Sequence, residues 1–108
     1  MANTFTSYVA KNVGTSASTL VTVASATQTT VIGLSVANTS ASTITCDIYF
    51  TRSGTDYYIV KGAVVPNGLS FVAVGGDQKL VLITGDALKV VTSAATSADV
   101  IASVLNIT

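Results

Sequence analysis

Turn-forming residues recur about every ten residues along this chain, and the segments between them are rich in Val, Thr and Ile. Clear examples are Arg52-Ser53-Gly54-Thr55, Pro66-Asn67-Gly68 and Gly75-Gly76-Asp77-Gln78. β-Branched residues favour strands, and the strong helix former Glu is absent from all 108 residues. Short strands at this spacing are typical of antiparallel sandwiches and barrels. The sequence therefore predicts an all-β fold over residues 1–108, a single antiparallel β-sandwich or jelly-roll-like domain of about eight to nine strands.

The segments between the turns have the composition of strands. The expected strands are Phe5–Val13, Ser18–Ala24, Thr30–Ala37, Thr43–Thr51, Asp56–Lys61, Leu69–Val74, Lys79–Thr84, Leu88–Thr92 and Val100–Ile107. Apolar and polar side chains alternate most clearly in Thr43–Thr51, which indicates a strand with one buried face. That face should carry Ile44, Cys46, Ile48 and Phe50. By the same argument Ile32, Leu34 and Val36 should face together in Thr30–Ala37.

Two connections predict β-hairpins. Arg52–Thr55 is short and polar, so Thr43–Thr51 should pair with Asp56–Lys61. Gly75–Gln78 should likewise return the chain, so that Leu69–Val74 is followed by its partner. In both turns, and at Gly85-Asp86, small or polar residues supply the backbone freedom that a reversal needs.

Charged residues are rare, and this scarcity excludes several classes of function. They make up 9% of the chain, against about 25% in an ordinary domain. Five Lys and Arg balance five Asp, which argues against binding to nucleic acid because that function needs a basic surface. The chain has no His, so the commonest general base and metal ligand are both missing. We therefore expect no catalytic residue, no cofactor and no metal site, and a protein that is not an enzyme.

The other residues that could carry chemistry have simpler structural explanations. Asp77 and Asp86 follow glycines, where Asp side chains stabilise turns, and no closely spaced acidic set suits calcium. Cys46 is the only cysteine, so it has no intrachain disulfide partner. Its place on the expected buried face predicts an inert thiol.

Three tyrosines lie on the two strands of the first hairpin, namely Tyr49, Tyr57 and Tyr58. They could form a stacking platform for sugars or bases. Packing of aromatic rings between neighbouring strands is the favoured explanation.

No segment predicts export or insertion into a membrane. The N-terminal residues lack the basic start and apolar core of a signal peptide. The longest apolar runs are far shorter than the roughly 18 residues that a spanning helix needs. We therefore expect no membrane partner and synthesis within a cell without export.

The last expected strand is apolar on both faces. Val100, Ala102 and Val104 share one face, and the other carries Ile101, Leu105 and Ile107. A sandwich has one interior, so only one face can lie in it. Scattered apolar side chains are tolerated on protein surfaces, but a continuous row on a chain so poor in charge favours a covered surface. We predict that Ile101, Leu105 and Ile107 belong to an interface of a homo-oligomer or a larger assembly.

Much of the chain resembles a group of small structural proteins of tailed-phage virions. The similarity spans roughly residues 19–107, leaves the first strand unmatched, and is carried by Val31–Thr39, Tyr57–Ala63, Val65–Val74, Lys79–Val90 and Asp99–Leu105. It is a pattern of turns and strands: Pro, turn, apolar strand, Lys-containing strand, Gly-Asp and strand. The resemblance implies a loop-rich β-sandwich located on a virion that assembles in the host cytoplasm.

The same resemblance implies a non-enzymatic role, in the first place as a capsid decoration (cement) protein. Its expected partners are copies of itself, which could form a trimer at threefold positions, and the major capsid protein or other virion proteins. A neck, tail or baseplate component is an alternative. A receptor- or carbohydrate-binding fibre module is another, and it would need exposed loop aromatics beside Asp or Asn.

Overall fold

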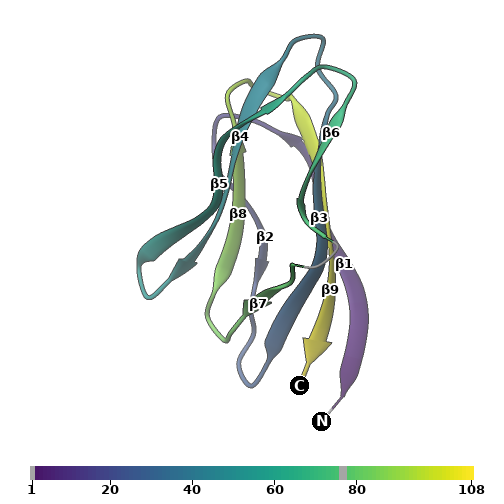
Figure 1. The fold of residues 1–108 in the computed structure, drawn as a ribbon. Helices are drawn as coiled ribbons and strands as arrows, with labels where there is room; N and C mark the ends of the chain where they lie inside the picture. Colours follow the sequence, from purple (N-terminus) through teal and green to yellow (C-terminus); the bar gives the residue numbers. More distant parts are fainter. Residues whose placement is uncertain (1, 76–77) are drawn as a thin grey trace.

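The computed structural model describes residues 2–75 and 78–108, which form two antiparallel sheets packed face to face (Figure 1). The strands are β1 (Asn3–Val13), β2 (Ser18–Thr22), β3 (Gln28–Asn38), β4 (Ile44–Arg52), β5 (Thr55–Val65), β6 (Ser70–Val74), β7 (Leu80–Leu82), β8 (Ala87–Thr92) and β9 (Ala98–Ile107). The first sheet has the order β1-β9-β3-β6, with β7 also paired to β3, and the second has the order β2-β8-β4-β5. The predicted all-β sandwich is confirmed, and no helix occurs in the described residues.

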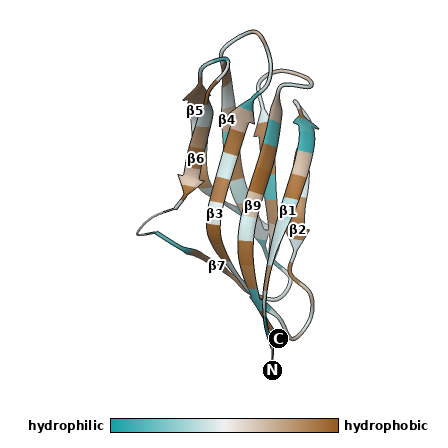
Figure 2. Cartoon of the chain, turned by 90° about the vertical axis from the view of Figure 1, so that its right-hand side faces the viewer, coloured by the Kyte–Doolittle hydropathy of each residue, from teal (hydrophilic) through white to brown (hydrophobic). Residues whose placement is uncertain are grey.

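The core lies between the two sheets and is built from alternate residues of nearly every strand. In β9 the side chains of Val100, Ala102 and Val104 are buried, as the sequence predicted. Leu88 and Val90 of the facing sheet are fully buried opposite them. Figure 2 shows the resulting alternation of apolar and polar residues along β3 and β9. Because alternate residues of each strand point into the core, the residues between them face the outside of the molecule.

The β4–β5 hairpin agrees with its prediction in the pairing of the two strands and in the side chains of β4 that face the core. Its two-residue loop places Ser53 at φ 52° and Gly54 at φ 78°, the pair of positive angles found in type I′ turns. Ile44, Cys46 and Ile48 are buried, as the alternation required. The hairpin is longer than expected, because β5 continues past Lys61 to Val65.

The predicted face of β3 is wrong at Ile32. Val31 is fully buried and Ile32 is only half-buried, whereas Leu34 and Val36 do lie in the core. The pairing of β3 with β9 shifts register between Val31 and Gly33. A bulge of this kind inserts one extra residue and so reverses which residues face inward on one side of it.

The predicted hairpin between β6 and β7 is also wrong. Both strands pair with β3, β6 along Leu34–Ala37 and β7 along Thr29–Val31. The segment between them closes a local loop at an isolated bridge between Gly75 and Gln78, after which the chain continues along the same side of β3. β3 is longer than β6, so the part of β3 that β6 leaves unpaired is where β7 adds to the sheet. The turn role predicted for Asp77 lies outside the described residues.

Candidate functional site

Titratable side chains do not gather into a catalytic cluster in the part of the chain that the structure describes. No group of three or more His, Cys, Asp or Glu there could hold a metal ion. A hollow of about 330 Å³ at one end of the sandwich is lined by neutral residues: Ala26, Thr27, Gln28, Thr84, Ile107 and Thr108. None of its lining side chains is charged.

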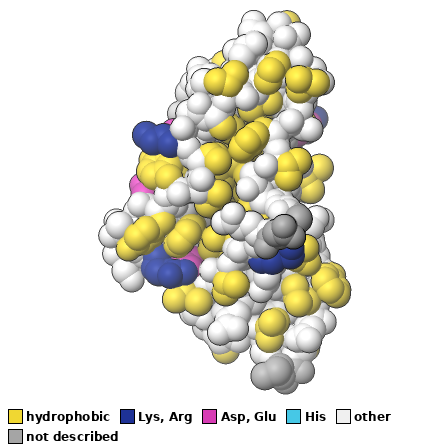
Figure 3. Space-filling model, viewed as in Figure 1, with side chains coloured by type: hydrophobic (Ala, Val, Ile, Leu, Met, Phe, Trp, Pro, Cys, Tyr) yellow, Lys and Arg dark blue, Asp and Glu magenta, His cyan; other side chains and the backbone are white. Residues whose placement is uncertain are grey.

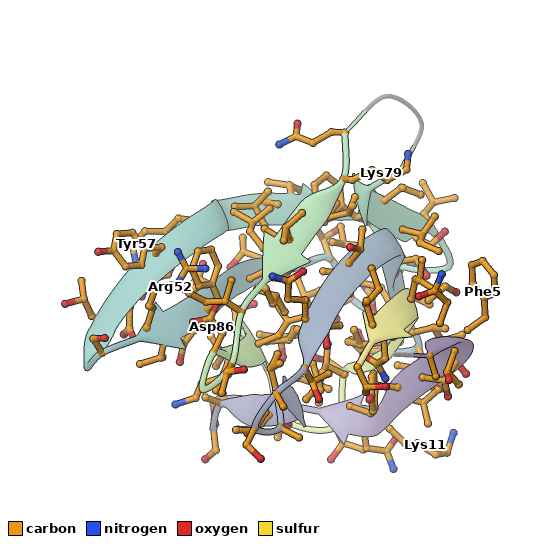
Figure 4. All side chains as sticks on the ribbon, turned by 90° about the horizontal axis from the view of Figure 1, so that it is seen from below. Phe5, Lys11, Arg52, Tyr57, Lys79 and Asp86 are labelled. Carbon is orange, nitrogen blue, oxygen red and sulfur yellow. The ribbon has the colours of Figure 1, made fainter. Side chains whose placement is uncertain are left out.

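Asp86 has a structural partner that the sequence analysis did not identify. Its carboxylate is 1% exposed and accepts hydrogen bonds from Arg52, at 2.9 Å from Nε and 2.6 Å from Nη2. The N–H of Ile83 donates to the same carboxylate at 3.0 Å, which confirms the turn role predicted for Asp86. The hydrogen bonds from Arg52 are the main cause that lowers the pKa of Asp86. The pair ties the end of the β4–β5 hairpin to the turn before β8 (Figure 4).

The thiol and the tyrosines occupy the places that the alternation predicted. Cys46 is 1% exposed, and burial together with the nearby charge of Asp47 raises the pKa of its thiol. Tyr49 packs on Tyr58 across the strands, with ring centroids 4.9 Å apart. The Lys61 ammonium lies 4.4 Å from the centroid of the Tyr58 ring, so one side of this ring is already occupied.

Large apolar side chains form two rows across the outer face of the first sheet, the side turned toward the viewer in Figure 2. Strand pairing defines the rows: Phe5–Leu105–Thr30–Val81 and Val9–Ile101–Ser35–Val72. Their most exposed apolar members are Phe5 (74%), Val9 (70%), Val72 (64%), Val81 (54%) and Ile101 (50%). Between the rows lie Ser7 on β1 and Ser103 on β9, and on β3 Gly33 together with the half-buried Ile32 at the bulge. We call this surface the outer apolar face.

The outer apolar face carries little charge. Among the described strand residues of the first sheet, the charged ones are Lys11 and Asp99, which pair at 3.3 Å near one end. The N–H of Asn12 also donates to Asp99, and this bond is the largest cause that lowers its pKa. Lys79 lies at the far rim, just before β7. Charge on the second sheet is more abundant, with Asp47, Asp56, Lys61 and Lys89 on its strands. Figure 3 shows acidic and basic groups mainly on the side of β4 and β5.

Two of the three predicted interface residues, Ile101 and Leu105, lie in the rows of the outer apolar face, whereas Ile107 lies beyond them and lines the hollow at the end of the sandwich. Ile101 is half exposed, whereas Leu105 and Ile107 are partly covered by their neighbours on the sheet. Four further members of the face were not predicted: Phe5 and Val9 lie on β1 beside β9, and Val72 and Val81 lie on β6 and β7, beyond β3. Val72 and Val81 stand in continuous apolar runs, which do not show which side chains face outward, and the pairing of distant strands was not visible in the sequence. Whether the face contacts another molecule stays a prediction.

The face is large enough to form one side of a specific interface. Three strands of ten or eleven residues, together with β6 (five residues) and β7 (three residues) beside β3, cover roughly 650 Å² at about 3.4 Å per residue and 4.8 Å between strands. A standard protein–protein interface buries about 800 Å² on each partner.

Comparison with known proteins identifies no relative: no family model and no curated protein matches the chain. Within the described residues there is no helical segment capable of spanning a membrane. The candidate functional site is therefore defined by its geometry, and it is the outer apolar face.

Proposed function

We propose that this chain is a non-enzymatic structural protein of a tailed-phage virion, a capsid decoration protein that self-associates and docks on the particle. The outer apolar face is the observation that carries this proposal. A face with so many exposed large side chains and one ion pair invites nonspecific association if it stays in water. Docking on a particle covers it, and the resemblance of residues 19–107 to virion proteins supplies the kind of particle.

Burial of the exposed side chains would contribute free energy to docking. Burying a large apolar side chain contributes about 1.5–3 kcal/mol, and the five most exposed residues have half or more of their surface available. Covering them yields about 5–9 kcal/mol before the entropic cost of association is subtracted. Many copies on a lattice repeat this contact, so moderate affinity for each copy is sufficient.

The weak charge of the face indicates the chemistry of the partner. Lys11 and Asp99 neutralise each other, so the face neither attracts phosphate nor repels a neutral protein surface. Binding that depends on apolar burial should change little when the salt concentration rises, in contrast to binding through phosphate contacts. We therefore expect a proteinaceous partner with an apolar patch, such as the capsid lattice.

The test is sedimentation of the purified protein with separated heads and tails of the phage that encodes it. The double variant Ile101→Asp/Val72→Asp puts two charges into one row of the face, at positions 50% and 64% exposed. We expect saturable binding of the wild type to heads and at least a tenfold loss in the variant.

The matched control places the same two charges on the second sheet, as Thr19→Asp/Val64→Asp, and should bind like the wild type. Both residues are exposed, so folding should tolerate either change, and circular dichroism checks this. Binding to tails but not heads would move the protein to the neck or tail. A wild type that binds neither component would refute the proposal.

A further inference from the structure

The two sheets have four edges, formed by β1, by β6 with β7, by β2 and by β5, and three of these edges are protected against pairing with another chain. β2 has five residues and a register shift between Thr19 and Val21. β5 contains bulges opposite Cys46–Tyr49, and the N–H of Gly62 is turned aside to Asp47. The edge formed by β6 and β7 is interrupted between Val74 and Leu80. Short strands, bulges and interruptions are the usual devices that prevent edge-to-edge association.

β1 lacks these protections over most of its length. It pairs with β9 in uninterrupted register from Asn3 to Ala10, and its first irregularity lies beyond Ala10. It contains no Pro, and its one charged residue is Lys11. Figure 1 shows β1 at the margin of the sheet, with β9 on one side of it only. An edge that is long, regular and uncharged can accept another strand.

The backbone of β1 shows which groups face the open edge. Ala2 and Thr108 exchange two hydrogen bonds, from Ala2 N–H at 3.1 Å and from Thr108 N–H at 2.9 Å. In an antiparallel pair such residues alternate with ones whose N–H and C=O point away from the partner strand. Phe5, Ser7 and Val9 therefore direct their backbone polar groups away from β9, and their side chains lie on the outer apolar face.

We propose that β1 pairs with β1 of a second copy, antiparallel, about a twofold axis that passes beside Ser7. This arrangement names the contact for the self-association in the proposed function and deepens it to that extent. Ser7 then lies opposite the partner's Ser7, and Phe5 lies opposite the partner's Val9. Aromatic and β-branched residues in directly opposite positions stabilise sheets. Roughly six backbone hydrogen bonds join the copies across these three residues of each strand.

Other registers fit less well. Sliding by two residues places Phe5 opposite Ser7 in one direction and opposite Lys11 in the other, so its apolar partner is lost. Sliding by one residue places the outer apolar face of one copy beside the inner face of the other. In the proposed register Lys11 lies opposite the neutral Asn3, so no like charges oppose each other. This complementarity of β1 with itself identifies a second copy as the occupant of the edge.

The pairing also extends the docking surface. The row that contains Phe5 in one copy continues into the row that contains Val9 in the other, so the two outer apolar faces join into one. The resemblance to virion proteins led us to expect a trimer, whereas twofold pairing of this edge gives a dimer.

Cysteine cross-linking tests the register. In hydrogen-bonded antiparallel pairs the Cα atoms are about 5.5 Å apart, within the range of a disulfide. Oxidation of Ser7→Cys should therefore give a covalent dimer. Ser103→Cys is the matched control, because Ser103 pairs with Ser7, is likewise exposed and lies one strand further from the edge. In the proposed dimer the Cα atoms of residue 103 in the two copies would be about 14 Å apart, because three strand spacings separate them. Native Cys46 is buried and should not react.

We expect at least tenfold more dimer for Ser7→Cys than for Ser103→Cys on a nonreducing gel. Equal yields, or a higher yield for Ser103→Cys, would show that the copies pack face to face and would overturn the proposed pairing. Absence of cross-linking in both variants would overturn it as well.

Ser7→Pro provides a second test. The N–H that it removes points away from β9, so the internal ladder keeps its bonds while the pairing between copies loses them. Light scattering should show a dimer for the wild type and for Ser7→Ala, and a monomer for Ser7→Pro. A monomeric wild type at 100 µM would refute the pairing, even if it binds particles. A dimer that binds no particle supports the pairing and refutes only the proposed function.

Discussion

Replacing Arg52 by Leu should destabilise the protein substantially, because it leaves the Asp86 carboxylate without its main partner. Asp86 is 1% exposed, so its charge cannot be hydrated in place. The change removes two charge-assisted hydrogen bonds, at 2.9 and 2.6 Å, and leaves the one from Ile83 N–H. Such bonds contribute about 1.5–3 kcal/mol each. The Arg52 side chain is 37% exposed, so water replaces part of what is lost.

We therefore expect the free energy of unfolding to fall by about 2–3 kcal/mol at pH 7. The melting temperature should fall by roughly 8–12 °C, since a domain of this size loses about 4 °C per kcal/mol. The assay is urea and thermal denaturation followed by circular dichroism at one protein concentration. Lys61→Leu is the control, because the Lys61 side chain is 68% exposed and its ammonium lies 3.8 Å from the Asp47 carboxylate. Such surface pairs contribute less than about 1 kcal/mol.

The pH dependence gives an independent check. The folded pKa of Asp86 is lowered from 3.8, so its contribution to stability is present above pH 3.8 and is lost as the pH falls through the folded value. Without Arg52, desolvation raises the pKa of the buried Asp86 carboxyl. Protonation then removes the buried unpaired charge and so reduces the loss of stability in the variant. The difference in free energy of unfolding between wild type and Arg52→Leu should therefore begin to narrow above pH 3.8, and it should go on narrowing until the pH falls through the lowered pKa of the wild type. A loss under 1 kcal/mol at pH 7, or a gap that does not change with pH, would refute this reasoning.

Two further predictions concern the β4–β5 hairpin. A thiol reagent should modify Cys46 on the order of 100-fold more slowly in the native state than in denaturant, because the thiol is buried and its pKa is raised; equal rates would contradict the observed facing of β4. Gly54→Ala should lower the free energy of unfolding by about 1 kcal/mol, because a residue with a Cβ is strained at φ 78°. The added Cβ would meet no atom within 4 Å, so backbone strain is the only expected cause. As a control, Ser53→Gly removes the Cβ from the neighbouring residue with positive φ and should cause no loss of stability in the same denaturation assay.

Local patterns predicted the strands and the first hairpin well. In β4 the alternation of apolar and polar residues was regular, so the burial of Ile44, Cys46 and Ile48 followed directly. In β3 the same argument failed at Ile32, because a bulge is set by pairing with β9 and leaves little trace in the sequence. The turn before β7 was recognised, but a turn signal does not reveal which strand the following segment pairs with, and β7 pairs with β3.

The candidate site was predictable only in part, for a similar reason. The two apolar faces of β9 identified Ile101, Leu105 and Ile107. The rest of the outer apolar face comes from β1, β6 and β7, which lie far from β9 in sequence. The partner of Asp86 could not be predicted either, because Arg52 is distant in the chain and only the folded structure brings it to Asp86.

The position of β9 has a consequence for folding. It lies between β1 and β3, so the middle of the first sheet is empty until residues 98–107 have been synthesised. Contacts between such distant segments form slowly, and we expect folding in milliseconds to seconds. During that interval β1 and β3 expose unpaired backbone to other nascent chains. The strand that completes the sheet also holds β1 in an extended conformation, so assembly through β1 has to wait for the fold to close.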